Sequence, residues 1–393
     1  MSKVYFDVRD IAKALRLGFS GKKMALGFVG VVLGYVGYAI LAYLALLAGG
    51  YPFGEIWGSY KFYPCVAGLS LPWYSWVIYG VGVVFWVLVL LATAAGIVKI
   101  AYRQLKGDEF YSLGDARKFL RKNWKAAVVS PWIILAVFAF LIAVGIVIGI
   151  IGRIPYFGEL FVSVFLFLIF AGSLFAVFTA VVFAFSLMLS PAVVGTAEED
   201  TLETIVQSFS TVWSQPWRLV LYEVLLGIYV VLTTALLGAF TIAALWLVHW
   251  ICGLLMGDSM VKLTHVALGY LPNFGFWSAL WTKLGWLPLR EGAEITRATV
   301  QVSGVIAGIW LALILGFVLS YGWTSWTVGQ GVIYLVLRYK KDQENLLERK
   351  EREEEEVKEE VKEEAKEAEK EEKTEEKKEE EGKEGTEGSS SES

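Results

Sequence analysis

The chain has 393 residues, of which 56% are hydrophobic, and its formal net charge at pH 7 is −4. Its mean hydropathy of +0.55 is higher than soluble domains usually reach, which argues against a soluble globular protein. The charge is divided unevenly: residues 341–393 hold 12 Lys and Arg against 24 Asp and Glu, a net of −12, while residues 1–340 carry a net of +8. No basic patch on a soluble domain points to nucleic acid.

Six long apolar runs, nearly uncharged through their middles, divide the basic part of the chain. A helix needs about 20 apolar residues to cross a membrane, and a backbone in lipid must satisfy its own hydrogen bonds. The runs therefore predict an all-α, polytopic membrane helical bundle with six spans. They are residues 24–49, 74–101, 126–152, 159–190, 219–252 and 300–337.

Lys and Arg are concentrated in every second connecting segment. The segments on the side of residue 1 hold 17 of them, and the segments on the other side hold six. Because short cytoplasmic loops carry the excess of positive charge, both termini are expected in the cytoplasm and the protein in the inner (cytoplasmic) membrane. The first apolar run is too long for the core of a cleaved signal peptide.

Three short segments that precede apolar runs resemble one another. "DIAKALRLGFS" (10–20), "DARKFLRKNWK" (115–125) and "TIVQSFSTVWS" (204–214) align without gaps. Each is amphipathic and is expected to form a helix that lies in the membrane interface, with its apolar stripe toward lipid. The stripes are Val8, Ile11, Leu15 and Phe19; Leu113, Ala116, Leu120 and Trp124; and Leu202, Ile205, Val206, Phe209, Val212 and Trp213.

The three segments predict three pseudo-repeats within a membrane domain at 1–340, each an interfacial helix followed by a helical hairpin. The repeats cover about 4–101, 112–190 and 201–337. The first two are basic, and their cations are candidate contacts for lipid headgroups or for a partner protein. These are Arg16, Lys22, Lys23, Arg117, Lys118, Arg121, Lys122 and Lys125.

The third copy differs in charge, because Glu198, Glu199, Asp200 and Glu203 face only Arg218. An acidic copy is expected to pack against a basic one, with Glu199 or Glu203 near Arg117, Arg121 or Lys122.

This pattern, with "SPAVVGTAEEDTLETIVQSFSTVW" (190–213) turning into the third helix, resembles six-helix bacterial membrane proteins that include the membrane domain of glycerophosphoryl diester phosphodiesterases. The resemblance covers roughly 1–340 and implies the same fold, but it carries no catalytic residue across. The phosphodiesterase barrel has no counterpart in this chain. Neither a Walker A loop nor GxSxG, HExxH or a dinucleotide fingerprint is present, so neither enzymatic activity nor a cofactor is expected.

A few polar residues in or near the spans are candidates for function. Glu223 is a carboxylate that pairs with Arg218 or with a basic repeat, or else it is a proton or cation site. His249, Cys252, Asp258 and His265 could meet, but their spacing matches no zinc pattern and no metal is expected.

The two cysteines, Cys65 and Cys252, would both lie outside. They could form a disulfide or remain free thiols, and a bridge requires Cα atoms within about 7 Å.

Three features leave alternatives open. The run from Leu219 to Gly257 has 39 residues, about 60 Å as a helix; one tilted span is preferred to two because no turn signal interrupts it. The aromatic segments 51–76 and 271–289 are membrane-interface belts or a partner surface. The tail, 341–393, is expected to be an acidic Glu/Lys-rich cytoplasmic helix that becomes disordered, and not a coiled coil. It is a solvated, solubilising tail or else a docking segment for a protein partner.

The sequence favours a non-enzymatic integral membrane protein of structural or accessory type. The alternative is a transporter or channel for a small or lipid-like solute, with a pathway lined by Thr233, Thr234 and Glu223.

Overall fold

The computed structural model describes residues 5–66, 68–271 and 298–348, and every regular element in this part of the chain is an α-helix. The predictions for the tail beyond residue 348 and for the aromatic segment at 272–289 concern residues outside these ranges. All the helices belong to one unit, residues 1–346. They are α1 (Arg9–Gly18), α2 (Gly21–Ala48), α3 (Phe53–Tyr60), α4 (Trp73–Lys106), α5 (Leu113–Gly152), α6 (Phe157–Val164), α7 (Leu166–Ala197), α8 (Thr201–Ser214), α9 (Pro216–Met256), α10 (Asp258–Leu268) and α12 (Ala298–Asp342).

Six of these helices, α2, α4, α5, α7, α9 and α12, are long and apolar enough to cross a membrane. Each contains most of one predicted apolar run. Large apolar side chains cover much of their surface; Leu255 and Phe167, for example, are 96% and 83% exposed. A protein in water does not leave so much apolar surface uncovered, so the helices indicate an integral membrane protein built as a helical bundle.

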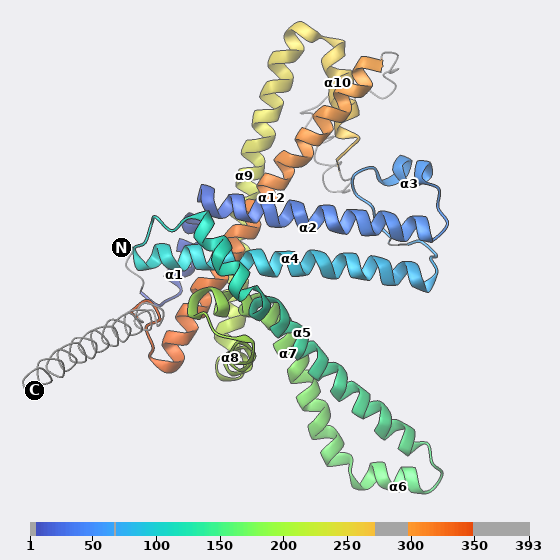
Figure 1. The fold of residues 1–393 in the computed structure, drawn as a ribbon, viewed down its shortest axis with the longest axis vertical. Helices are drawn as coiled ribbons and strands as arrows, with labels where there is room; N and C mark the ends of the chain where they lie inside the picture. Colours follow the sequence, from blue (N-terminus) through green and yellow to red (C-terminus); the bar gives the residue numbers. More distant parts are fainter. Residues whose placement is uncertain (1–4, 67, 272–297, 349–393) are drawn as a thin grey trace, which may run out of the picture. The chain divides into compact units, whose positions relative to one another are not determined.

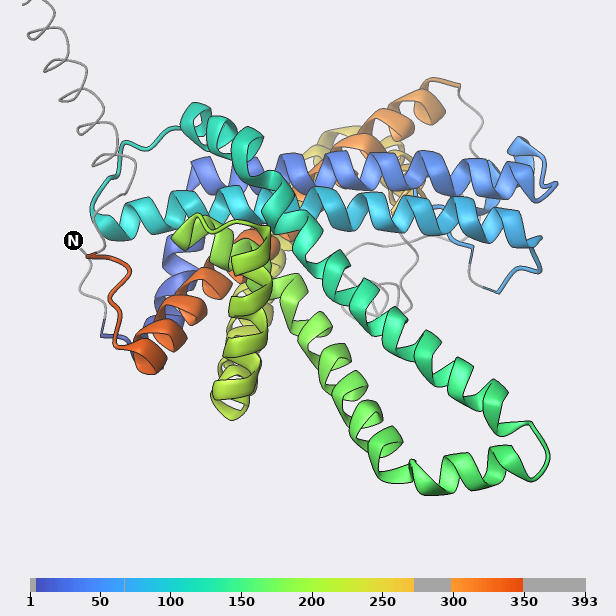
Figure 2. The same ribbon diagram turned by 60° about the horizontal axis from the view of Figure 1, so that its bottom comes forward.

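The long helices pack as pairs. Figure 1 shows α2 beside α4 and α5 beside α7, and α12 packs against both α9 and α10. The fourth predicted run is divided: α6 closes the far end of the α5–α7 pair (Figure 2) and α7 begins only at Leu166. The division falls at Phe165, which lies outside the helical region at φ −95° and ψ 9°. A tight reversal precedes α6, in which Gly158 comes so close to the Gly152 carbonyl that a Cβ would lie 2.5 Å from its oxygen.

The fifth run forms one uninterrupted helix of 41 residues, α9, as the missing turn signal suggested. It ends at Gly257, whose φ of 55° reverses the chain into α10. Positive φ values favour glycine because it has no Cβ.

Two of the three predicted interfacial helices are separate elements, and one is not. α1 ends before the bend at Phe19 and Ser20. α8 ends before Gln215, which precedes Pro216 and is held out of the helical region (φ −139°). The prediction is wrong for the second copy, because residues 115–125 continue without a break into the span as part of α5. No glycine or bend interrupts "WKAAVVS" (124–130).

The start of α5 is a capping box formed by Ser112 and Asp115, which have the three-residue spacing that this motif requires. Ser112 Oγ accepts a hydrogen bond from the Asp115 N–H at 3.1 Å, and the Asp115 carboxylate accepts from the Ser112 N–H at 3.2 Å. This capping box satisfies two N–H groups at the helix start.

The C-terminal half of α12 lies at the centre of the unit. It packs against α1, α2, α4, α7, α8 and α9, and every residue from 327 to 337 is buried. Small residues allow the close approach: a Cβ on Gly329 would lie 2.3 Å from Leu226 of α9, and one on Gly331 would lie 2.9 Å from Val98 of α4. We call residues 320–337 of α12 the central segment.

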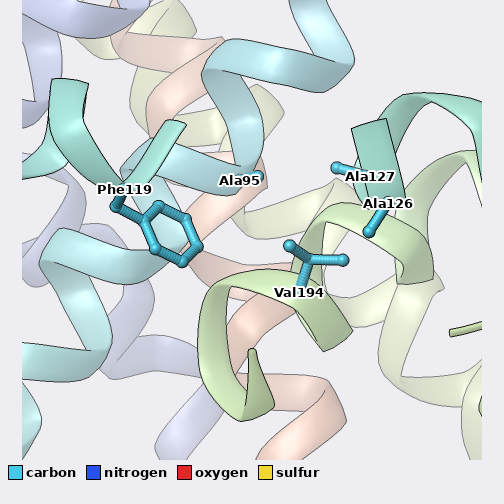
Figure 3. Packing of buried hydrophobic residues seen from close by; sticks show 5 residues of the cluster. All are labelled: Ala95, Phe119, Ala126, Ala127 and Val194. Atoms are coloured by element: carbon cyan, nitrogen blue, oxygen red, sulfur yellow. The ribbon is translucent and has the colours of Figure 1, made fainter. Parts of the chain in front are cut away.

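A second close contact joins α4, α5 and α7. Ala95 of α4, Phe119, Ala126 and Ala127 of α5 and Val194 of α7 form one buried cluster (Figure 3). Three of the five are alanines, so the helix backbones come close together at this crossing.

Replacing Gly195 of α7 by alanine tests this crossing, because the new Cβ would lie 2.7 Å from Val98 Cβ and 2.9 Å from the Ala95 carbonyl oxygen. Neither atom is the end of a flexible side chain, so we expect Gly195→Ala to lower stability by about 1–3 kcal/mol. Gly149→Ala is the control, because nothing lies within 4 Å of its Cβ position; it should be neutral or slightly stabilising. Thermal unfolding in detergent checks both, and equal stability of the two variants would contradict the crossing.

Candidate functional site

The N-terminal part of α5 carries a continuous basic face. Arg117, Lys118, Arg121, Lys122 and Lys125 are all exposed. At about 100° per residue, they span about 140° of the helix surface. We call these five residues the basic face of α5.

The opposite side of the same turns is packed. Ala116, Phe119, Ala126 and Ala127 are buried against α4 and α7. The basic face therefore points away from the protein, while the apolar side fixes the helix in place.

Exposed aromatic residues accompany the basic positions. The three aligned aromatics, Phe19, Trp124 and Trp213, are 64%, 42% and 75% exposed. The predicted stripes are thus divided, because Ile11, Ala116 and Val212 are buried while the aromatic end of each stripe is exposed. Phe19 and Trp213 still touch the protein edge-on, through Tyr321 of α12 and Phe178 of α7. Trp at a membrane–water boundary places its ring at the headgroup level.

The third segment, α8, buries polar side chains and exposes apolar ones, the reverse of a surface helix in a soluble protein. α8 buries Thr204, Gln207, Ser208 and Thr211 and exposes Leu202, Val206 and Trp213. Its polar side therefore packs on the protein, as expected for a helix whose apolar side meets lipid.

Lys23 is not a headgroup contact, which corrects the sequence prediction. Its side chain is completely buried and its Nζ donates a hydrogen bond to Gln104 Oε1 at 2.7 Å. Lys22 and Arg16 are exposed. Lys22 reaches the carbonyl oxygens of Glu109 and Tyr111, just before α5, at 3.2 and 3.3 Å. Lys23 turns inward because it begins the face of α2 that includes buried Met24, Leu26 and Gly27.

Glu223 and Arg218 are separated by the packing of α9. Glu223 is buried and its Oε2 accepts a hydrogen bond of 2.7 Å from Gln330 Nε2 of the central segment. Arg218 is exposed. Among the ion pairs of the described residues, none includes Glu223, so the expected pair with Arg218 is not formed.

Sequence reasoning missed a buried ion pair between Lys99 of α4 and Glu198, the residue that ends α7. The Lys99 side chain is 3% exposed and the Glu198 side chain 28%. The sequence prediction placed Glu199 or Glu203, not Glu198, near Arg117, Arg121 or Lys122, and that placement stays a prediction. The partner of Glu198 in this ion pair lies on α4, and only the contact of α4 with α7 brings the two together.

The end of α12 joins several parts of the chain by polar contacts. Arg338 donates to Gln207 of α8 and pairs with Asp342 and Glu344, both at 3.0 Å. Lys340 lies 3.5 Å from the Asp7 carboxylate and 3.2 Å from the Tyr222 hydroxyl of α9. The Val8 N–H and then Lys340 hold the pKa of the exposed Asp7 carboxyl below its usual value.

The candidate disulfide between Cys65 and Cys252 is not formed. Cys65 and Cys252 are free thiols, so the disulfide is wrong. The loop of Cys65 meets the far end of α10, where Lys61 Nζ donates to the Gly269 carbonyl at 2.7 Å.

Within the described residues, no group of three or more His, Cys, Asp and Glu is placed to hold a metal ion. His249 Nδ1 instead lies 2.9 Å from Thr264 Oγ1.

Comparison of the chain with family models, with curated proteins and with solved structures found no match.

Replacing Glu198 by glutamine tests the buried ion pair. The change leaves the Lys99 ammonium buried without its counter-charge, and we expect a loss of about 1–3 kcal/mol in unfolding free energy. Adding Lys99→Met should recover much of the loss, because an apolar pair has no charge to bury. Glu159→Gln, at an exposed glutamate of α6, is the control. Denaturant unfolding in micelles measures the series, and equal stability of all four proteins would count against a stabilising pair.

Proposed function

We propose that this protein is a non-enzymatic integral membrane protein of structural or accessory type that binds anionic lipid headgroups through the basic face of α5. The observation that carries the proposal is the outward direction of all five cations on one helical face, beside the exposed ring of Trp124. Lysine and arginine near an anionic leaflet each contribute about 1 kcal/mol of attraction.

The buried cations support the same interpretation by contrast. Lys23 and Lys99 each have a protein partner, Gln104 and Glu198, inside the helical unit. The five cations of the basic face lie instead at exposed positions. The proposed relation to the membrane domain of glycerophosphoryl diester phosphodiesterases rests on the sequence pattern alone.

A transporter or channel is the second candidate, and one observation favours it: Glu223 is a buried carboxyl without a cationic partner. Two other proposed lining residues are occupied by the protein itself. The Thr233 hydroxyl donates to the Tyr229 carbonyl of its own helix at 2.9 Å, and Thr234 packs against Gly322 of the central segment. The lipid-binding function therefore stands first.

Two charge-neutralised variants test lipid binding. Arg117→Gln with Lys118→Gln removes two charges from the basic face. At about 1 kcal/mol for each charge, we expect affinity for phosphatidylglycerol to fall about 30-fold. Native mass spectrometry of the protein titrated with this lipid in mild detergent gives the dissociation constants.

The matched control is Arg153→Gln with Lys262→Gln, which removes the same charges from the opposite end of α5 and from α10. It should bind phosphatidylglycerol like the unchanged protein. Equal affinity of the two double variants would contradict the proposed lipid site, and loss of a co-purifying protein in its place would identify the basic face as a protein interface.

Both termini are proposed to lie in the cytoplasm, together with α1, the start of α5 and α8. Single cysteines replacing Arg16, Lys118 and Ser214, all exposed positions, should react with a membrane-impermeant maleimide only in inverted vesicles. A variant that retains only Cys65, which is exposed, should react only in intact spheroplasts. Reaction of any of the first three in spheroplasts would overturn this topology.

A further inference from the structure

Two side chains that share a hydrogen bond, Glu223 and Gln330, each hold a buried acceptor oxygen without a donor among the described residues. Glu223 Oε2 accepts from Gln330 Nε2 at 2.7 Å. The second oxygen of each side chain, Glu223 Oε1 and Gln330 Oε1, is buried and has no hydrogen-bond partner within the described residues. Glu223 is 9% exposed and Gln330 is 2% exposed. Buried acceptors without a donor are unfavourable by about 1–3 kcal/mol each.

The packing around Glu223 offers no positive charge to compensate a carboxylate. α9 packs against α1, α8, α10 and α12. On α12, Arg338 is engaged by Gln207, Asp342 and Glu344, and Lys340 by Asp7 and Tyr222.

The remaining charged groups around α9 belong to α1, α8, α10 and α9 itself. On α1, Lys13 pairs with Asp10, while Arg9 and Arg16 are exposed; on α9 itself, Arg218 is exposed. On α8, Glu203 accepts from Gln207. The charged groups of α10, Asp258, Lys262 and His265, lie beside the opposite end of α9.

We propose that Glu223 and Gln330 form a proton-binding site, in which the Glu223 carboxyl is protonated and donates to Gln330 Oε1 while the Gln330 amide donates to Glu223 Oε2. A carboxylic acid and a primary amide have matching donor and acceptor edges. A single proton then satisfies both unpartnered oxygens, removes the buried charge, and joins α9 to the central segment by two reciprocal hydrogen bonds.

A bound metal cation is the competing occupant and fits the site less well. Hard cations such as Mg²⁺ and Ca²⁺ take six or more oxygen ligands, whereas this pair presents two free acceptor oxygens. A proton needs only a donor atom and one acceptor. The number of free oxygens therefore favours the proton.

The site has a mechanical consequence. Loss of the proton would leave a buried carboxylate beside the Gln330 carbonyl oxygen, and two negative oxygens facing each other repel. The contact between α9 and the central segment would loosen, so proton binding and the packing of α9 are coupled. This inference does not depend on lipid binding by the basic face.

Infrared difference spectroscopy of the full-length protein in nanodiscs tests the proton directly. We expect a carboxylic acid C=O band at pH 7 that is lost in Glu223→Gln and shifted in Gln330→Leu, which keeps the carboxyl but removes its partner. The Gln330→Leu arm assigns the band even if Glu223→Gln does not fold. Absence of a protonated carboxyl band in the unchanged protein would overturn the proposal.

Thermal unfolding supplies an independent readout. Glu223→Gln should be as stable as the unchanged protein or more stable, because two glutamines satisfy each other in the same reciprocal way. The same chemical change at Glu198, where a charge is needed, should reduce stability. If Na⁺ or K⁺ instead raises the unfolding temperature of the unchanged protein and not that of Glu223→Gln, the site holds a metal cation and the proton-binding proposal fails.

Discussion

Burial of the central segment of α12 on all its sides is the constraint on which the rest of this structure depends. A helix surrounded by others must present small residues where backbones approach and must satisfy each polar group it carries. Gly329 and Gly331 meet the first requirement toward α9 and α4. Thr327, whose hydroxyl donates to the Trp323 carbonyl at 2.8 Å, meets the second within its own helix, whereas Gln330 Oε1 of the same segment is buried without a partner among the described residues.

Charged groups are distributed according to this packing. Cations that face the interior, such as Lys23 and Lys99, have partners on neighbouring helices. Cations on the outer side of α5 lie at exposed positions. A residue's role is therefore decided by the side of the helix it occupies, and Lys22 and Lys23 show that adjacent residues can differ completely.

Features that depend on one segment alone were predictable from the sequence. The six long helices follow from runs longer than a membrane span, and the start of α5 follows from the spacing of Ser112 and Asp115. Features that depend on which helices meet were not predictable. The burial of Lys23, the pair of Lys99 with Glu198 and the partner of Glu223 each require knowing the neighbour across a helix contact. The continuity of α5 was missed for another reason. Its first segment resembles two segments that end before their spans, whereas α5 continues through Pro131.

The position of α12 in the chain has a consequence for how the protein is made. The helix that occupies the middle of the unit is the last of the six to leave the ribosome. Until it arrives, the glycine-bearing faces of α1 and α2, where Gly18 and Gly27 will meet Ser325 and Thr324, have no cover. Glu223 likewise has no hydrogen bond from Gln330 until that residue, 107 positions later, is inserted. The earlier helix pairs are thus inserted as unfinished pieces, and the insertion machinery must tolerate them until the last helix completes the assembly.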